Sequence, residues 1–240
     1  MAGWSDSELS HSSSNRNGIA TVLDADAEVV RREPGASVMT RTDSAIVLCG
    51  GRSSRMGRDK ATLPFGSETL LTRVVGVVAA VVDDVVVVGN VTQAMDRHVR
   101  VVADSIEGLG PLAGLTTGLA EVRHSRALVV GCDMPLLSPL LLRRLLTLAG
   151  DADACVPRVD GTPMTTCAVY STRVLAQGQS QLATGTRSLR ALLDGLSVVW
   201  VDGDDLRDVD PELLSFWDCD TPDRYHTALQ HAGLPVPFGS

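Results

Sequence analysis

Long apolar runs are missing from the sequence, and this absence excludes an integral membrane protein. The richest apolar stretch, residues 74–88, is interrupted by Gly76, Asp83 and Asp84. No segment therefore approaches the roughly 18–20 apolar residues that a membrane helix needs. Residues 1–42 also lack the apolar core of a secretory signal. We expect a cytoplasmic protein without a membrane partner.

Cysteine pairs and excess positive charge are also missing. The five cysteines are odd in number and none forms a C-x-x-C pair, so we expect reduced thiols rather than a disulfide framework or a zinc site. The formal net charge is −8, whereas sequence-independent binding of nucleic acid needs a basic face. We therefore expect no nucleic-acid partner. Lysine is the scarcest charged residue, because Lys60 is the only lysine among 21 basic residues.

Two regions of different composition divide the 240 residues. Residues 1–42 are rich in serine and hold too few apolar residues to offset the entropy of ordering, so we expect a disordered extension. From Ser44 onward, short apolar runs alternate with segments long enough for helices, which is typical of a parallel sheet covered on both faces. The expected strands are 45–49, 85–88, 99–102, 127–130, 154–157, 164–170 and 198–201, and the expected helices are 69–82, 112–123, 139–149, 186–193 and 222–231. We predict one α/β domain over 43–240, with a doubly wound, mostly parallel sheet and helices on both faces.

The segment that follows the first expected strand carries the features of a phosphate site. Ligands of open α/β sheets bind beyond the carboxyl ends of the strands. Gly50 and Gly51 allow close approach of the backbone, whose successive N–H groups can bind an anion. Four cationic side chains follow within nine residues: Arg52, Arg55, Arg58 and Lys60. The spacing is neither that of a Walker A loop nor that of the dinucleotide fingerprint.

A second candidate site lies at the end of another strand. Asp133 follows the expected strand 127–130, and a carboxylate at a strand tip can hold Mg²⁺ together with phosphate oxygens. The residues alone also leave open an Asp that caps the following turn.

The segment Leu48–Lys60 resembles the signature of the MobA-like nucleotidyltransferases, L-x-G-G-x-S-x-R-M-G-x-D-K. Within that family the chain looks most like the molybdenum cofactor guanylyltransferases, over roughly residues 44–230. Three later blocks support the resemblance: 103–105 with 110–115, 131–135, and 218–223. The resemblance implies the Rossmann-like fold of nucleotide-diphospho-sugar transferases.

The resemblance also implies roles for individual residues. It implies catalytic roles for Lys60, Arg55 and Asp133, with Lys60 on the triphosphate. It places Mg²⁺ on Asp133 and Asp220. It implies nucleotide contacts at Leu48, Cys49, Gly50, Gly51, Lys60, Asn90, Asp104, Gly110 and Asp133.

The implied activity is the transfer of GMP from Mg²⁺·GTP to molybdopterin, which gives the guanine dinucleotide cofactor and pyrophosphate. The implied partners are GTP, the molybdenum cofactor, other cofactor-assembly proteins and molybdoenzymes. Three alternatives stay open: a CTP-dependent molybdenum cofactor cytidylyltransferase, a sugar-phosphate nucleotidylyltransferase, and a nucleotide-binding protein without catalysis.

One departure from the family pattern bears on the choice of base. Guanylyltransferases usually carry Asn-x-Asn-Thr-Pro where this chain has Asp218-Cys219-Asp220-Thr221-Pro222. An Asp at the position of Asp220 occurs in related cytidylyltransferases. Against this, Gly50-Gly51 stands where the CTP-dependent relatives read Ala-Gly, and they lack the block 110–114. Aromatic residues make up only 3% of the chain, so we do not expect the base to be recognised by stacking.

Overall fold

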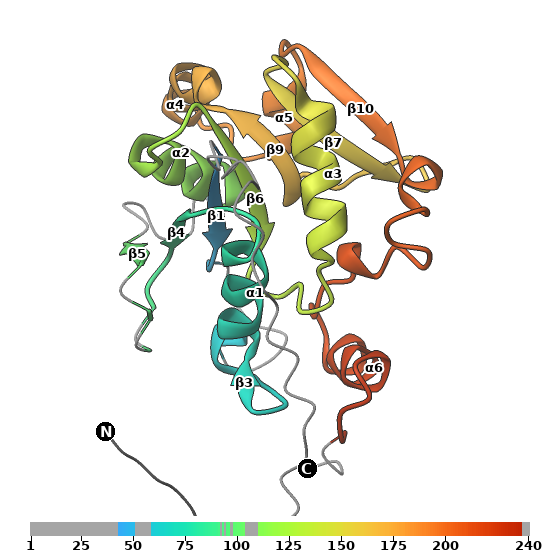
Figure 1. Ribbon diagram of the computed structural model, residues 1–240. Helices are drawn as coiled ribbons and strands as arrows, with labels where there is room; N and C mark the ends of the chain where they lie inside the picture. Colours follow the sequence, from blue (N-terminus) through green and yellow to red (C-terminus); the bar gives the residue numbers. More distant parts are fainter. Residues whose placement is uncertain are drawn as a thin grey trace, which may run out of the picture. The chain divides into compact units, whose positions relative to one another are not determined.

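The computed structural model describes residues 43–50, 59–91, 93, 95–96, 98–103 and 110–236. The extension expected over 1–42 lies outside these residues. Within them, an eight-stranded sheet runs in the order β10-β7-β9-β6-β1-β4-β5, with β8 beside β7 (Figure 1). Its strands are β1 (Ser44–Leu48), β4 (Asp84–Val88), β5 (Val99–Val102), β6 (Arg126–Gly131), β7 (Ala154–Val159), β8 (Thr162–Pro163), β9 (Cys167–Ser171) and β10 (Val198–Asp202).

The centre of the sheet is parallel. Strand β1 lies between β4 and β6 with Leu48 opposite both Val88 and Gly131, so the carboxyl ends of these three strands meet at one edge. Strand β5 continues the parallel set beyond β4. The strand β9 is antiparallel to both β6 and β7, which makes the sheet mixed. The prediction of a mostly parallel α/β sheet is confirmed.

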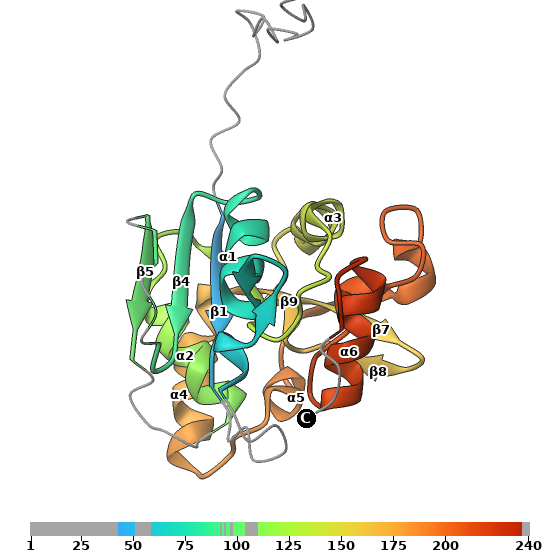
Figure 2. The same ribbon diagram turned by 90° about the horizontal axis from the view of Figure 1, so that it is seen from below.

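Helices cover both faces of the sheet. They are α1 (Leu70–Ala79), α2 (Pro111–Glu121), α3 (Pro139–Ala149), α4 (Leu175–Ala183), α5 (Leu189–Leu193) and α6 (Pro222–His231). Helices α1 and α3 lie on one face and α2, α4 and α5 on the other (Figures 1 and 2). Each layer has its own core, because alternate side chains of β1 and β6 point to opposite faces. Ala45 and Val47 pack with α1 and α3, whereas Ile46 packs with α2 and α5.

Side-chain caps fix where the helices begin. Ser138 accepts a hydrogen bond from the Leu141 amide ahead of Pro139, and Thr221 does the same for Arg224 ahead of Pro222. Both helices start where the sequence predicts.

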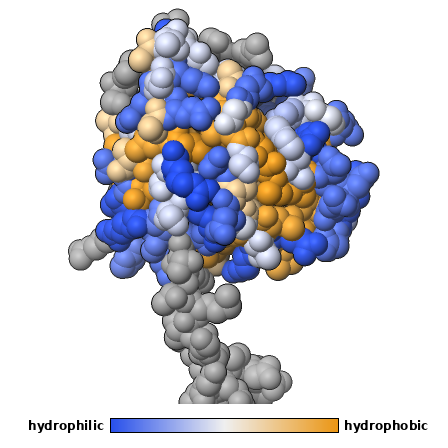
Figure 3. Space-filling view, turned by 90° about the horizontal axis from the view of Figure 1, so that it is seen from above, coloured by the Kyte–Doolittle hydropathy of each residue, from blue (hydrophilic) through white to orange (hydrophobic). Residues whose placement is uncertain are grey.

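Among the described residues no helix is long and apolar enough to cross a bilayer. Seen from above, hydrophobic residues (orange) gather toward the middle of this face, and hydrophilic residues (blue) lie around them (Figure 3).

Several expected boundaries are wrong for identifiable reasons. The helix expected at 69–82 ends at Ala79, since the chain turns at 80–81 ahead of β4. The helix expected at 186–193 begins only at Leu189, behind its cap Ser188. The strand expected at 164–170 starts at Cys167, because residues 164–166 form a turn in which the Cys167 amide donates to the Met164 carbonyl. The helix α4 was not expected at all.

A third, smaller core ties the segment after Lys60 to the end of the chain. The 3-10 helix η1 (Lys60–Thr62) leads into a hairpin of β2 (Pro64–Phe65) and β3 (Glu68–Thr69). Phe65 of this hairpin and Tyr225 of α6 belong to one buried cluster. The Tyr225 hydroxyl also donates a hydrogen bond to the Pro64 carbonyl. The cluster therefore holds α6 against the segment that begins with Lys60.

Candidate active site

Most of the predicted site residues that the structure describes lie at the carboxyl edge of the parallel strands. Leu48 ends β1, and Cys49 and Gly50 follow it. Asn90 follows β4, Asp133 follows β6, and Gly110 caps the amino end of α2. Lys60 opens η1, and Asp220 directly precedes the cap of α6. Arg55, Gly51 and Asp104 lie outside the described residues.

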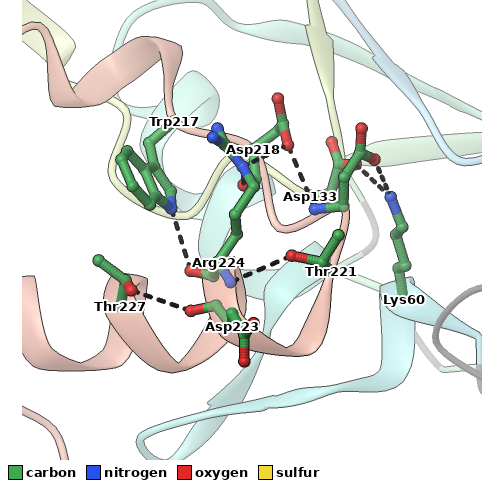
Figure 4. A network of polar contacts seen from close by, with 9 residues as sticks. Lys60, Asp133, Trp217, Asp218, Thr221, Asp223, Arg224 and Thr227 are labelled. Carbon is green, nitrogen blue, oxygen red and sulfur yellow. Dashed lines mark hydrogen bonds and ion pairs between the residues drawn. The ribbon is translucent and has the colours of Figure 1, made fainter.

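Lys60 joins two carboxylates from distant parts of the chain. Its ammonium Nζ donates to Asp133 Oδ2 at 3.0 Å and also to Asp220 Oδ1 (Figure 4). The Lys60 and Asp133 side chains are 18% and 20% exposed, whereas Asp220 is 55% exposed. The cluster is thus open to solvent on the Asp220 side, where a substrate can approach.

The two carboxylates set the charge state of Lys60. Burial by itself lowers the pKa of an amine, but hydrogen bonds and attraction from Asp220 and Asp133 outweigh it and raise the pKa of Lys60. Lys60 therefore stays a cation at neutral pH. A cation between the two carboxylates cancels part of their negative charge and so reduces their repulsion of a polyphosphate.

Backbone contacts place Asp133 at the tip of β6. The Cys132 amide donates to the Leu48 carbonyl at 3.0 Å, which extends the pairing of β1 and β6 past their last residues. A Cβ on Gly131 would lie 2.6 Å from Asp133 Oδ1, so a side chain at this position would push the carboxylate out of its present place. The Cys219 amide donates to the Asp133 carbonyl at 2.9 Å. This last bond joins the Asp133 loop to the segment that carries Asp220.

Sequence reasoning missed a group of residues beside Asp220. The Asp218 carboxylate accepts from the Asp220 amide at 3.2 Å and from Arg224 Nε at 3.0 Å, and the Arg224 guanidinium lies 4.3 Å from the centre of the Trp217 ring. Burial, and then repulsion from Asp220 and Asp133, raise the pKa of Asp218 although Arg224 opposes the shift. The sequence did contain a signal for Asp218, because it lies two residues before the predicted ligand Asp220.

The remaining predicted residues lie at the same edge of the sheet, in the loops that follow other strands. A Cβ on Gly89 would lie 1.8 Å from the Cys49 carbonyl oxygen, so the loops after β1 and β4 touch. A hydrogen bond with Cys49 and burial raise the pKa of the Cys132 thiol. Gly110 has φ of 80°, and a Cβ there would lie 3.2 Å from the Arg187 carbonyl oxygen. Gly110 thereby brings the start of α2 next to the segment before α5.

The donor set of the cluster fits a magnesium ion. Asp133 and Asp220 both direct a carboxylate oxygen at one point, which the Lys60 ammonium holds. Mg²⁺ prefers oxygen ligands and is commonly bound by one or two carboxylates plus phosphates. Among the described residues no group of three or more His, Cys, Asp or Glu side chains is arranged to hold a metal by itself. Asp133 and Asp220 are the side chains that would hold the ion.

Comparison with known proteins identifies the family. A family model described as the MobA-like NTP transferase domain matches residues 45–199. The chain belongs to this family of nucleotidyltransferases. The matched range runs from the second residue of β1 to the second residue of β10, so Asp220 and α6 lie beyond it.

Curated relatives of this MobA-like transferase extend the match. A probable molybdenum cofactor guanylyltransferase of Methanosarcina mazei is 34% identical over 203 residues, which cover 79% of this chain and 91% of the relative. One of Mycobacterium avium, also named a probable molybdenum cofactor guanylyltransferase, is 41% identical over 63% of this chain and 80% of its own. The crystal structure of molybdopterin-guanine dinucleotide biosynthesis protein A from Archaeoglobus fulgidus has the same fold. It has a TM-score of 0.68, with 24% identity over 79% of this chain and 98% of that one.

Proposed function

We propose that this MobA-like transferase moves GMP from Mg²⁺·GTP to the terminal phosphate of molybdopterin and releases pyrophosphate. The observation that carries the proposal is the meeting of Lys60, Asp133 and Asp220 at the carboxyl edge of the sheet. The relatives named molybdenum cofactor guanylyltransferase support the choice of GTP and molybdopterin as substrates.

Two reactants of like charge must meet in this reaction. An oxygen of the acceptor phosphate forms a bond to the α-phosphorus of GTP while the bond from that phosphorus to the β-phosphate oxygen breaks. Pyrophosphate leaves with the electron pair. Because the acceptor phosphate is already an anion, the step needs no strong general base. The protein has to position the reactants and to stabilise negative charge, as in other phosphoryl transfers.

Lys60, Asp133 and Asp220 divide this work. Asp133 and Asp220 would hold Mg²⁺, which when bound neutralises charge on the phosphates of the nucleotide. Lys60 would then turn from the carboxylates to the triphosphate and stabilise the charge that grows on the departing pyrophosphate. Arg55 would assist it, since a guanidinium can bind two phosphate oxygens. Leu48, Cys49, Gly50, Gly51, Asn90, Asp104 and Gly110 would line the rest of the nucleotide site.

The first test is a thermal-shift panel of GTP, CTP, ATP and UTP, each with and without Mg²⁺. A ligand that binds only the folded state raises the unfolding temperature Tm. We expect Mg²⁺·GTP to give the largest increase and then to support the release of pyrophosphate in the presence of molybdopterin. The Asp133→Ala variant should keep the Tm of the free protein and lose transfer. Transfer at the wild-type rate in this variant would remove Asp133 from the metal site.

One observation favours a second candidate, a CTP-dependent transferase. Asp220 contributes a carboxylate to the Lys60 cluster where guanylyltransferases usually carry an amide. A larger Tm increase with Mg²⁺·CTP than with Mg²⁺·GTP would select this alternative. Nucleotide binding without release of pyrophosphate would instead point to a protein that has lost catalysis.

The assignments of a single domain over 43–240, an extension over 1–42 and a cytoplasmic location remain predictions. So do contacts with cofactor-assembly proteins and molybdoenzymes.

A further inference from the structure

Arg224 makes a closed set of contacts with the segment that precedes α6. Its Nε donates to the Asp218 carbonyl at 2.9 Å and to Asp218 Oδ1 at 3.0 Å. Its guanidinium packs over the Trp217 ring, and Trp217 Nε1 donates to the Arg224 carbonyl at 3.0 Å (Figure 4). Stacking on an aromatic ring and directed hydrogen bonds are properties of arginine that lysine does not share. The pair therefore fixes the backbone between residues 217 and 224.

These contacts are transmitted to Asp220 through Asp218. The carboxylate that accepts from Arg224 also accepts from the Asp220 amide at 3.2 Å. On the other side of Asp220, Thr221 caps α6 by accepting from the Arg224 amide at 3.3 Å. Arg224 thus acts on both sides of Asp220, through its side chain before it and through its amide after it. The direction of the Asp220 side chain toward Lys60 depends on this turn.

Arg224 also neutralises negative charge in this part of the molecule. Three carboxylates gather here, those of Asp133, Asp218 and Asp220, and among the described residues the cations that bind them are Lys60 and Arg224. Lys60 forms ion pairs with Asp133 and Asp220, and Arg224 forms one with Asp218. Without Arg224, the Asp218 carboxylate would repel those of Asp133 and Asp220 without compensation and would displace Asp220 from Lys60.

We propose that Arg224, stacked on Trp217, is a positioning residue that neutralises Asp218 and, through it, presents Asp220 to Lys60. The importance of this arrangement for GMP transfer rests on the proposed function. The arrangement itself does not, and it can be tested without any nucleotide.

The single lysine of the chain provides the test. In protein freed of divalent cations with EDTA, Lys60 is acylated with an N-hydroxysuccinimide ester, and its rate of modification is followed by peptide mass spectrometry. An ammonium group held by two carboxylates reacts slowly because the carboxylates shield its nitrogen from the reagent, and a displaced Asp220 would expose it. We expect Arg224→Leu to raise the rate about threefold to tenfold, in line with coupling between groups of one network.

The matched control is Arg207→Leu. Arg207 also joins a carboxylate and a carbonyl, since its Nε donates to Asp204 at 2.9 Å and its Nη1 to Pro211 at 2.8 Å. We expect this variant to leave the rate at Lys60 unchanged. A rate that is unchanged in Arg224→Leu, or one that rises equally in both variants, overturns the proposal. Should Arg224→Leu fail to fold, Asp218→Ala removes the shared acceptor instead, and the same rise at Lys60 is expected.

A second measurement separates positioning from simple support of the fold. With the nucleotide that stabilises the wild-type protein, we expect Arg224→Leu to lower kcat more than it raises KM. Adding Asp218→Asn to the same chain should restore much of kcat, because the amide keeps an acceptor but carries no charge. A double variant no better than Arg224→Leu would show that Arg224 only packs on Trp217, and would overturn the proposal. Absence of transfer by the wild-type protein would contradict the proposed function, while the labelling result would still decide the role of Arg224.

Discussion

At the scale of single residues, the cluster is built around one amine. Lys60 lies between the carboxylates of Asp133 and Asp220, and all three are fixed by elements that are far apart in the sequence. The compact ammonium can accept two carboxylate partners in a small space, whereas a guanidinium needs a flat site. This geometry gives a reason for a lysine in a chain that otherwise uses arginine.

Replacement of Lys60 should separate its catalytic from its structural contribution. We expect Lys60→Met to lower the rate of a single turnover of GMP transfer about 10²–10³-fold, because one charged donor to the reacting phosphates is lost. In the free protein the two carboxylates are left facing each other, so Tm should fall at low salt and recover as salt screens them. Arg207→Met, which removes an exposed cation elsewhere, should change neither quantity. A single-turnover rate equal to the wild type would remove Lys60 from the site.

At the scale of secondary-structure elements, the amino ends of β1 and β4 are held by a buried carboxylate. Asp84 accepts from Ser44 Oγ at 2.7 Å, from the Arg123 amide at 2.9 Å and from Arg100 at 2.6 Å. Burial alone would raise its pKa, but these donors outweigh burial and lower the pKa of Asp84 below its ordinary value. The network lies at the edge of the sheet opposite to Lys60, so it can be altered without touching the site.

The sign of this shift gives a pH prediction. A carboxyl whose pKa is lower in the folded state stabilises the fold above its unfolded pKa of about 3.9, and this stability is lost as pH falls through the folded value. We expect Asp84→Asn to lower the free energy of unfolding by about 1–3 kcal/mol at pH 7. The difference from the wild type should shrink below pH 4. Urea unfolding at pH 7, 5, 4 and 3 measures it, and a difference that stays constant with pH would contradict the role of the Asp84 charge.

The packing of α2 on β1 depends on a glycine. A Cβ on Gly118 would lie 2.6 Å from Cγ2 of Ile46, a fully buried side chain of β1. We expect Gly118→Ala to lower the free energy of unfolding by about 1–3 kcal/mol through overpacking, despite the better helix propensity of alanine. Gly76→Ala in α1 is the matched control, because nothing lies within 4 Å of its new Cβ.

For Gly76→Ala we expect a gain of up to about 1 kcal/mol, since only the propensity changes. The two variants therefore have opposite signs in the same denaturation experiment. A gain in both would show that α2 can move away from β1 at little cost.

Local signals explain which secondary-structure elements could be predicted from the sequence. Helices α3 and α6 have the expected bounds because Ser138-Pro139 and Thr221-Pro222 are strong local start signals. Helix α4 escaped prediction because its sequence is mostly polar and small. It is held by tertiary contact instead, since a Cβ on Gly178 would lie 2.6 Å from Thr116 Cγ2 of α2. The propensity of a segment cannot reveal such a contact.

At the scale of the whole molecule, local patterns leave the assembly of strands undetermined. An apolar strand such as β9 reads the same in either direction, so its antiparallel place between β6 and β7 could not be derived from its residues. For the same reason Lys60, Asp133 and Asp220 could be named as site residues, but their shared contact could not. That contact depends on the third core, in which Phe65 and Tyr225 bring the two ends of the domain together.

The boundary of the folded unit yields the last prediction. The three buried clusters are made of described residues from Ala45 onward, and Asp43 accepts from Arg126 Nε at 2.9 Å. A chain of residues 43–240 keeps all of these contacts. We expect it to unfold in urea with a free energy within about 0.5 kcal/mol of the full chain, because it keeps every contact of these three clusters. Its Tm increase with Mg²⁺ and nucleotide should also equal that of the full chain. A large loss of stability would assign residues 1–42 to the core, whereas a loss of the nucleotide effect alone would place them at the Lys60 cluster.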